Sequence, residues 1–385
     1  MFHVKQVKKI IYFDNAATSW PKPPETKEEV FKAMERFGAN PGRGSYRFAM
    51  DTKEYLESAR KEIAEFLGVY PHENLIFTAG NTMSSNIVIN HYKNEPGNVL
   101  YTGAEHNSII RSVKTAETAE NKTISIDILK NTKDGLKRFE RESEGKVKLA
   151  VVNHGSNVLG AIQPLAEVIK IANRKNIPIL GDMAQTAGLI PFSPTEAGLD
   201  FASYAGHKSL LGYGGIGCLY VRNPQQLKPL IYGGTGTLSH VAEQFSVAPS
   251  GFEAGTVNIL GVASLLGGIR YIKKIGMNKI REHELGLTEY FLKGLKEIPR
   301  IKVYHFSDLP QLPVVSLNVE GKMPGEVALY LEKQAGICVR AGLHCAPDAH
   351  KTVGTLAKGT VRFSFGHFNT YAEIDTALNV LERMR

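Results

Sequence analysis

The feature that most constrains the fold of this chain is a pair of short apolar strands that each lead to a charged side chain. The first predicted strand, 177–181, ends directly before Asp182, and Lys208 follows the second, 201–205. A glycine-rich turn at 212–217 comes next. A lysine that can form a Schiff base and a carboxylate that can hold a pyridinium nitrogen are the pair that pyridoxal phosphate (PLP) chemistry requires. A single pair is weak evidence, because most Lys and Asp side chains are solvated surface charges.

Other segments extend this pattern into an alternation of strands and helices. Apolar runs predict strands at 74–78, 98–102 and 148–153, and amphipathic periodicity predicts helices at 52–67 and 165–176. Strands that alternate with helices of ten or more residues form parallel βαβ units. Ligands of open parallel sheets bind beyond the carboxyl ends of the strands. The polar residues expected at that edge are Thr82, His106, Asn157, Asp182 and Lys208.

The turn at 79–86 separates the strand at 74–78 from the next helix and is rich in small and hydroxyl-bearing residues. Free backbone N–H groups at the N-terminus of a helix suit a phosphate. An ordinary N-cap has the same composition, so the turn alone does not establish a phosphate site.

A helix is also predicted nearer the N-terminus, at 28–37, after a cluster of prolines. Its apolar residues recur at helical spacing and are expected on one face: Val30, Phe31, Met34 and Phe37.

The last third of the chain has a mixed α+β pattern. Helices are predicted at 259–275, 278–297, 325–334 and 370–384, with strands at 314–319, 338–341 and 360–365. We therefore expect an α/β protein with a large domain, residues 15–260, that contains a mostly parallel sheet. A smaller α+β domain, residues 1–14 and 261–385, carries a cysteine-containing loop.

Composition limits the function further. The formal net charge of +8 is spread along the chain without a long Lys/Arg block, which disfavours nucleic-acid binding. No apolar run is long enough for a secretory signal or a membrane span. The three cysteines are odd in number and lack CxxC spacing, so neither a disulfide framework nor a metal site is expected. They are typical of a protein from the reducing cytoplasm.

The three cysteines lie in different contexts. Cys218 alternates within an apolar strand and Cys338 lies between two apolar residues, so both are expected to be buried, inert thiols. Cys345 lies in a loop rich in Gly, His and Pro and is expected to be reactive.

Eight short motifs, taken in order and spacing, resemble the class V aminotransferase family and, within it, the type II cysteine desulfurases, the group of SufS-like enzymes and selenocysteine lyases. They are YFDNAAT (12–18), the turn at Thr82, Glu105-His106, SNVLG (156–160), GDMAQ (181–185), GHK (206–208), FEAGT (252–256) and RAGLHCA (340–346). The resemblance covers nearly the whole chain and implies the fold type I of PLP-dependent transferases.

The resemblance implies roles around the cofactor. Lys208 would hold PLP covalently and then act as acid and base, Asp182 would pair with the pyridine nitrogen, and His106 would stack on the ring. The remaining cofactor contacts would come from Asn81, Thr82, Asn157, Gln185, His207 and Thr256, the last reaching the phosphate of a neighbouring subunit in a homodimer. Ala205 stands where the family usually has a phosphate-binding serine, and Ser203 lies two residues away on the same side of the strand.

The resemblance also implies the substrate contacts and the reaction. Arg362 would grip the substrate carboxylate, with Asn157, Arg43 and Ala17 lining the same entrance. Cys345 would attack the sulfur of L-cysteine, become a persulfide and leave L-alanine, aided by Arg340 and His344. A SufE- or SufU-like acceptor would take the sulfur, for iron–sulfur cluster assembly.

Three alternatives remain open at this point. A selenocysteine lyase, or another class V aminotransferase or β-lyase, would share most of these residues, although an aminotransferase has no need of Cys345. A non-catalytic scaffold of the same fold is disfavoured by the complete set of catalytic residue types. A nucleic-acid binder is disfavoured because no such motif is present.

Overall fold

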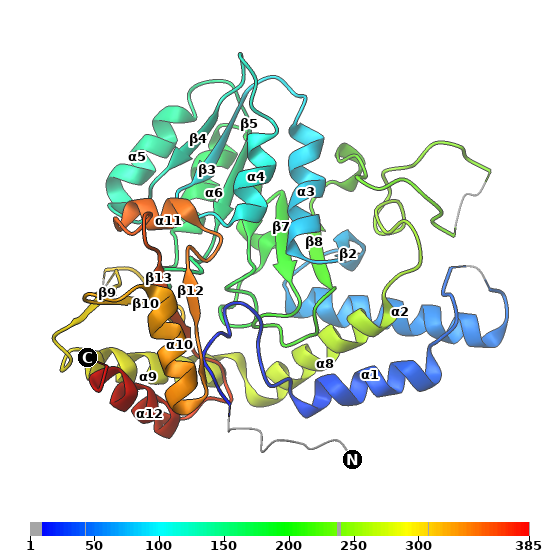
Figure 1. Ribbon diagram of the computed structural model, residues 1–385. Helices are drawn as coiled ribbons and strands as arrows, with labels where there is room; N and C mark the ends of the chain where they lie inside the picture. The colour runs from blue at the N-terminus through cyan, green and yellow to red at the C-terminus, as the bar shows by residue number, and fades with distance from the viewer. Residues whose placement is uncertain (1–9, 43, 237–239, 307, 385) are drawn as a thin grey trace.

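The computed structural model describes residues 10–42, 44–236, 240–306 and 308–384. Its larger part is built on a seven-stranded sheet with the strand order β2-β8-β7-β6-β5-β3-β4 (Figure 1). Strand β8 is antiparallel to both of its neighbours, and all other pairings are parallel. The strands are β2 (Leu75–Thr78), β3 (Asn98–Thr102), β4 (Thr123–Ile126), β5 (Val147–Asn153), β6 (Ile179–Asp182), β7 (Phe201–Ala205) and β8 (Gly217–Val221). The predicted mostly parallel sheet is confirmed.

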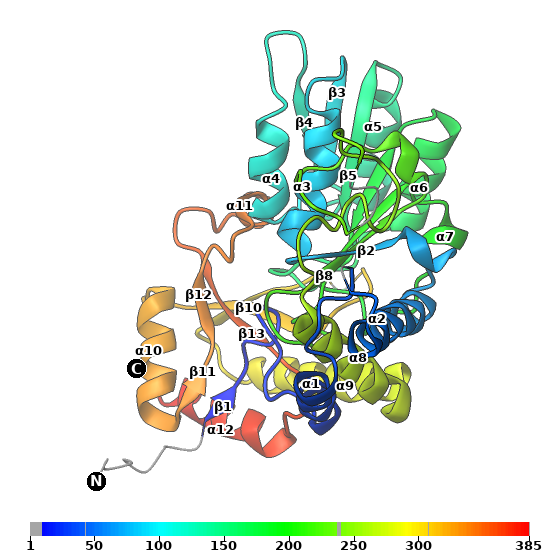
Figure 2. The ribbon, with the colours of Figure 1, turned by 90° about the vertical axis from the view of Figure 1, so that its right-hand side faces the viewer.

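Helices cover both faces of this sheet (Figure 2). Alternate residues of a strand point to opposite faces, so Tyr101 packs with helices α3 and α4 whereas Leu100 packs with the helices of the other face. The first face is covered by α3 (Asn81–Tyr92) and α4 (Asn107–Lys114). The second is covered by α2 (Arg47–Phe66), α5 (Thr132–Glu142), α6 (Leu165–Arg174) and α8 (Ile259–Ile275). Both faces are therefore buried, as a mostly parallel sheet requires.

Helix α1 (Pro24–Arg36) packs on α8, but it does not bury all the apolar residues expected on one face. Val30 and Phe37 pack against the core, whereas Phe31 is 63% exposed and Met34 58% exposed. The buried positions of α1 are Thr26, Glu29 and Ala33. The face that α1 turns to the core is the one with Thr26, Val30 and Ala33, and Phe31 and Met34 lie beside this face and stay exposed.

The smaller part contains an antiparallel sheet with the order β12-β13-β10-β9. Its strands are β9 (Ile301–Tyr304), β10 (Val314–Val319), β12 (Arg340–Gly342) and β13 (Thr360–Ser364). The helices around it are α9 (Met277–Leu295), α10 (Pro324–Ala335) and α12 (Tyr371–Glu382), whereas α11 (Pro347–Thr352) packs against the large part, where Ala349 joins Ala104 and Leu129. Strand β1 (Ile11–Tyr12) pairs with β11 (Ile337–Cys338), so the start of the described chain packs with its C-terminal part. Short turns complete the chain: α7 (Pro194–Ala197) and two 3₁₀ turns, His72–Asn74 and Pro224–Gln226.

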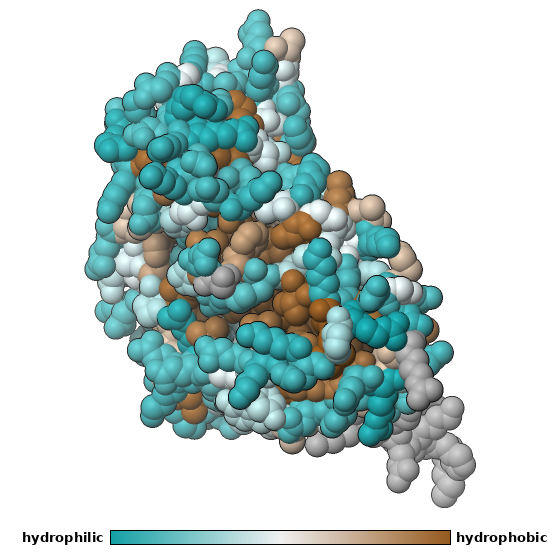
Figure 3. Space-filling model, turned by 90° about the vertical axis from the view of Figure 1, so that its left-hand side faces the viewer, coloured by the Kyte–Doolittle hydropathy of each residue, from teal (hydrophilic) through white to brown (hydrophobic). Residues whose placement is uncertain are grey.

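The two parts meet along a band that still exposes apolar atoms, visible in the middle of the face in Figure 3 between two mostly polar ends. The domain division at residue 260 stays a prediction. Five residues of α8 (Val262, Ala263, Leu265, Leu266 and Ile269) belong to the core of the large sheet, which favours a boundary between α8 and α9 instead. In the described part of the chain, none of the helices is long and apolar enough to cross a membrane.

Candidate active site

A cavity of about 700 Å³ lies at the carboxyl edge of the large sheet and gathers most of the predicted site residues. Those that line it are Ala17, Asn81, Thr82, His106, Asn157, Asp182, Gln185, His207, Lys208 and Arg362. Those from the large sheet converge because the strands that carry or precede them end at the same edge, whereas Arg362 reaches the cavity from β13 and Ala17 from the loop after β1. Cys345 and Thr256 do not line the cavity, and Arg43 lies outside the described residues.

One end of the cavity is formed by the N-terminus of α3. The N-cap residue is Gly80, at a φ of 149°, and the first intrahelical bond runs from Ser84 N to Gly80 O at 3.1 Å. The backbone N–H groups of residues 81–83 therefore have no partner within the helix, and a positive helix end faces the cavity. The start of β8 can lie this close to the start of α3 only because residue 217 is glycine: a Cβ there would lie 2.6 Å from the Gly80 Cα. The first turn of α3 therefore has the free N–H groups that suit an anion.

Ala205 occupies the position at which the family usually has a phosphate-binding serine. Ala205 lines the cavity without a hydroxyl, and the Ser203 hydroxyl lies fully buried, 3.2 Å from the Ser85 hydroxyl. Ser203 therefore does not replace the serine. An anion at this end is left with α3 and the neighbouring His207.

Asp182 ends β6 with its carboxylate almost wholly buried. Its Oδ1 accepts hydrogen bonds from Ala184 N at 2.9 Å and Asn81 Nδ2 at 3.1 Å. Burial raises the pKa of Asp182, while these two bonds and the charge of Lys208 oppose the rise. A buried carboxylate held in this way is placed to pair with a protonated ring nitrogen.

Lys208 follows β7 and lines the same cavity. Burial lowers the pKa of its amine to about 8, and the charges of Arg362 and Arg340 lower it further, against the attraction of Asp182. A substantial fraction of the amine is then neutral near physiological pH, as a lysine that attacks a carbonyl group requires.

Two histidines beside Lys208 are held neutral. Burial, with the nearby charge of Lys208, lowers the pKa of both His106 and His207 to about 4. His106 is the N-cap of α4, and its Nδ1 accepts a hydrogen bond from Ser108 N at 3.1 Å. Because Nδ1 is the acceptor, the proton of the neutral ring is on Nε2. An uncharged imidazole is suited to lie against an aromatic ring.

Arg362 is fully buried in β13, facing the cavity from the small sheet. Its Nη2 forms an ion pair with Asp14 Oδ1 at 2.6 Å, and its Nη1 donates to Asn157 O at 3.0 Å. Among the residues that the structure describes, its Nε has no hydrogen-bond partner. Arg340 lies opposite Arg362 in the register of β12 and β13 and also lines the cavity. A buried, partly unsatisfied guanidinium suits a carboxylate ligand.

Cys345 lies next to the cavity on the loop after β12. Arg340 Nη2 is 3.3 Å from Cys345 Sγ, and Asn107 N donates to Cys345 O at 2.6 Å. His344 and Cys345 have φ angles of 49° and 57°, an unusual conformation for two successive non-glycine residues. Asn157 Nδ2 donates to His344 O at 2.8 Å. The large part of the molecule therefore holds this strained loop in place.

The ring of His344 does not contribute charge at the thiol. It is buried against Thr360, and burial lowers its pKa to about 2, so it is neutral. The predicted help to a thiolate is therefore assigned to Arg340 rather than to His344. Burial raises the pKa of the fully buried Cys218, as expected of an inert thiol. Cys338 is only partly buried, contrary to expectation, because it lies in the two-residue strand β11.

Sequence reasoning missed a buried network behind the cavity. Glu105 accepts hydrogen bonds from Thr102 Oγ1 and Asn153 N, both at 2.6 Å. Burial, with repulsion from Asp182, raises the pKa of Glu105 to about 8. The only sequence indication was its place beside His106. Among the described residues, no three His, Cys, Asp or Glu side chains are grouped so that they could hold a metal ion.

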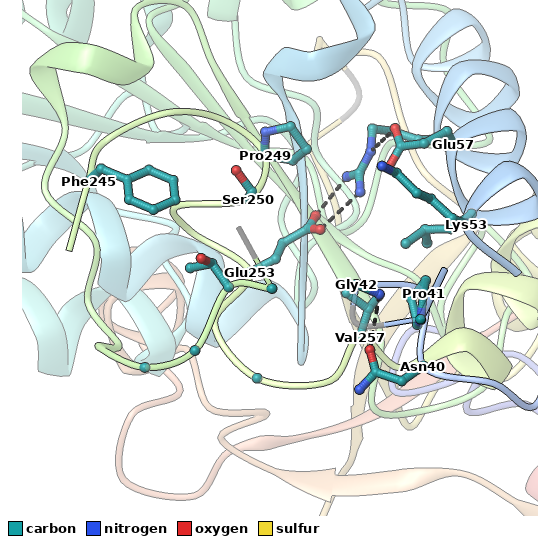
Figure 4. A pocket seen from close by; sticks show the side chains of 18 of the residues that line it. Asn40, Pro41, Gly42, Lys53, Glu57, Phe245, Pro249, Ser250, Glu253 and Val257 are labelled. Carbon is teal, nitrogen blue, oxygen red and sulfur yellow. Dashed lines mark hydrogen bonds and ion pairs between the residues drawn. The ribbon is translucent and has the colours of Figure 1, made fainter. Parts of the chain in front are cut away.

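A second, larger cavity of about 1380 Å³ lies between α2 and the segment 232–257 (Figure 4). Glu253 points into it and meets Arg60, whose Nη1 is 2.7 Å from Glu253 Oε1. Thr256 follows on the same loop, exposed, with its hydroxyl 3.3 Å from Asn40 Nδ2. Thr256 is thus separate from the cavity of Lys208 within one chain.

Comparison with known proteins gives a consistent result. The family model for the class-V aminotransferases matches residues 11–377. A probable cysteine desulfurase of Methanothermobacter thermautotrophicus is 32% identical, over 97% of this chain and 94% of that protein. A probable cysteine desulfurase of Pyrococcus abyssi is 33% identical with the same coverage.

Solved structures show the same fold. The apo structure of a cysteine desulfurase from Thermococcus onnurineus matches with a TM-score of 0.90 and 34% identity, over 98% of this chain and 94% of that one. The cysteine desulfurase CsdA from Escherichia coli matches with a TM-score of 0.85 at 24% identity, which supports the fold alone.

The class-V family is PLP-dependent, and the cavity fits this cofactor. The free amides of α3 suit its phosphate, Asp182 suits its ring nitrogen, and the amine of Lys208 suits its aldehyde. Two further polar atoms of the wall, Asn81 Oδ1 and Asn157 Oδ1, are buried and have no hydrogen-bond partner within the described part of the chain. The chain therefore belongs to the class-V aminotransferase family and, within it, to the cysteine desulfurase group, and PLP is its cofactor.

Proposed function

We propose that this protein converts L-cysteine to L-alanine and retains the sulfur as a persulfide on Cys345. The observation that carries the proposal is the contact between Arg340 and Cys345 Sγ, 3.3 Å, beside the cavity that contains Lys208 and Arg362. A transaminase needs the lysine and the arginine but has no use for a thiol held against a guanidinium at this place.

We assign the cofactor contacts to the walls of the cavity. The amides at the start of α3, Thr82 and His207 would hold the phosphate, and Asp182 with Asn81 would hold the ring nitrogen. His106 would lie on the ring face. Gln185 Nε2, which donates to Ala16 O at 3.1 Å, would bind the ring hydroxyl. When bound, PLP supplies an electron sink for the bonds at the substrate α-carbon.

The substrate would be oriented from the small sheet. The unpaired Nε of Arg362 is the donor we assign to the substrate carboxylate, and Asn157 with Ala17 would line that side. A contribution from Arg43 is proposed on the resemblance alone. The amine of Lys208, with a pKa lowered to about 8, would take the proton from the α-carbon and later return one to the substrate.

The sulfur step is assigned to Cys345. Its thiolate attacks the substrate sulfur, a new S–S bond forms, and the bond between that sulfur and Cβ breaks with its electron pair left on the carbon. A proton then completes the methyl group of alanine. Arg340 stabilises the negative charge on Cys345 before the attack.

A single-turnover assay with L-cysteine tests this assignment. Wild-type protein should release one alanine per site, with the extra sulfur mapped to Cys345 by mass spectrometry. Cys345→Ala should lose persulfide formation, whereas Cys338→Ala, a control at the other partly exposed thiol, should retain it. The protein is a β-lyase or transaminase if Cys345→Ala forms as much alanine as wild type, or if cysteine is consumed and no persulfide forms. It is a selenocysteine lyase if it turns over L-selenocysteine faster than L-cysteine and does not need Cys345 to do so.

We also propose that the protein is a cytoplasmic homodimer. The support is the exposed Thr256, which lies outside the cavity of its own chain, and the exposed side chains of Phe31 and Met34 on α1. Light scattering that gives a monomer mass at micromolar concentration contradicts the dimer.

By resemblance, a SufE- or SufU-like protein would accept the sulfur for iron–sulfur cluster assembly. Alanine production that never rises on addition of either acceptor contradicts that partner.

A further inference from the structure

Lys22 is a buried lysine that we have not assigned to catalysis, and its amine contacts the backbone next to Lys208. The side chain of Lys22 is 9% exposed, and burial lowers its pKa to about 8. In the part of the chain that the structure describes, it forms no ion pair with a carboxylate. Lysine is rarely buried without an acidic partner, because the desolvated charge costs free energy. The position therefore calls for a reason beyond surface solubility.

The hydrogen bonds of Lys22 lead to the backbone that carries Lys208. Lys22 Nζ donates to His207 O at 2.9 Å and to Ser19 Oγ at 2.7 Å. Ser19 Oγ lies 2.9 Å from Lys208 O and 3.2 Å from His207 O. Because this oxygen accepts from the ammonium, its single proton is free for the nearer carbonyl, that of Lys208. An ammonium thus reaches two successive carbonyl groups, one directly and one through a hydroxyl.

Further donors converge on the same point. His207 O also receives Ser19 N at 3.0 Å and Thr18 Oγ1 at 3.1 Å. Lys208 O also receives Leu211 N at 2.8 Å. With the Ser19 hydroxyl proton on Lys208 O, that carbonyl has two donors for its two lone pairs, and His207 O has three donors for its two.

We propose that Lys22 is a positioning residue for Lys208, holding the carbonyls of His207 and, through Ser19, of Lys208 so that the catalytic amine projects from a fixed backbone. The proposal rests on the assignment of Lys208 as the lysine that binds PLP. Precise placement matters because the same amine must reach the cofactor and then move protons at the substrate, and small displacements of a reacting group reduce rates strongly. The charge of Lys22 also helps to keep the adjacent His207 ring neutral.

The chain supplies a matched control. Lys148, at the start of β5, is also buried and also donates to two carbonyls, Lys93 O at 3.0 Å and Glu95 O at 2.9 Å, but does not line the cavity. Lys148→Met and Lys22→Met therefore remove the same kind of group from residues of similar exposed fraction, 6% and 9%. A purely structural role for Lys22 predicts that both variants behave alike.

The experiment compares holoenzymes of wild type, Lys22→Met, Ser19→Ala and Lys148→Met. We expect Lys22→Met to release PLP at least tenfold faster and to change the visible circular dichroism of the bound cofactor. Its kcat for L-cysteine should fall at least tenfold with a KM within twofold, because Arg362 is untouched. Ser19→Ala should shift in the same direction by less, and Lys148→Met should keep the wild-type cofactor signal even where it lowers the melting temperature.

The proposal is overturned if Lys22→Met and Lys148→Met have the same cofactor release rate and the same dichroism. Should Lys22→Met fail to fold, an unchanged cofactor signal in Ser19→Ala overturns it instead. Borohydride reduction of wild-type holoenzyme with peptide mapping separates this result from the underlying assignment: cofactor found on any residue other than Lys208 refutes the assignment, whatever the variants do.

Discussion

Replacing Glu253 by glutamine should destabilise the protein by about 3–5 kcal/mol, because it breaks a buried ion pair from one side. Arg60 and Glu253 have side chains 1% and 7% exposed. The two nitrogens of Arg60 lie 2.7 and 2.9 Å from the two oxygens of Glu253, and Phe77 N donates to the same carboxylate at 2.6 Å. A glutamine offers one acceptor, and its NH₂ group would face a second donor. The buried guanidinium would lose its buried counter-charge and keep only the exposed Glu57.

Glu57 provides the control, since it contacts the same guanidinium from the surface. Its side chain is 43% exposed and its Oε2 is 3.2 Å from Arg60 Nε, so Glu57→Gln should cost less than about 1 kcal/mol. Urea unfolding of both variants, followed by circular dichroism at saturating PLP, measures the difference. If Glu253→Gln lowers the free energy of unfolding no more than Glu57→Gln does, burial does not strengthen the contribution of the Arg60–Glu253 pair to stability.

Three further predictions concern the active site. The rate at which PLP-free protein captures PLP should rise with pH and level off above about 8, because only the neutral amine of Lys208 attacks an aldehyde; a stopped-flow rate still rising at pH 10 contradicts the lowered pKa. The contribution of Glu105 to stability should fall as pH rises from 4.5 to about 8, because burial raises the pKa of Glu105 and the unfolded chain releases that proton first. The buried histidines His106, His207 and His344 act in the opposite sense below pH 6.5, so the quantity to measure in urea titrations is the free energy of unfolding of wild type minus that of Glu105→Gln, which should fall across this range. Asp14→Asn should raise the KM for L-cysteine about tenfold by loosening Arg362, and an unchanged KM would exclude that role.

Much of the fold could be predicted from local pattern, and the failures have local causes. The predicted segments 201–205, 259–275 and 314–319 coincide with β7, α8 and β10, because their apolar residues are buried at the spacing of their own element. The edge strands β4 and β9 were not predicted. Both are short and only partly buried, so their sequences lack a strong alternation. Strand direction was also beyond the sequence, and β8 is antiparallel within an otherwise parallel region.

The site could be predicted where a residue follows a parallel strand, since the strand places it. Asp182 and Lys208 are of this kind. Lys22 was not predicted, because in a proline-rich turn it looks like a solvated lysine and only tertiary packing buries it. The charge state of His344 was also beyond the sequence, since its neutrality comes from burial against Thr360.

The geometry of the site requires that the two sheets keep a fixed relation. Lys208 and Asp182 belong to the large sheet, whereas Arg362 and Arg340 belong to the small one. A substrate bound by both groups must span the junction, so any change in the relation would separate the amine from the carboxylate-binding guanidinium.

The first described segment of the chain fixes that relation at both ends. Asp14 pairs with Arg362 at 2.6 Å, and Ser19, five residues later, is 2.9 Å from Lys208 O. Between them, Ala16 N donates to Ser364 Oγ at 2.9 Å on the small sheet. Because only five residues separate Asp14 from Ser19 and several of them are hydrogen-bonded, the distance between their two contact points can change little. Inserting or deleting a residue between Asp14 and Ser19 should therefore change substrate binding and cofactor orientation together, whereas a single substitution at either end should change mainly the contact that this residue makes.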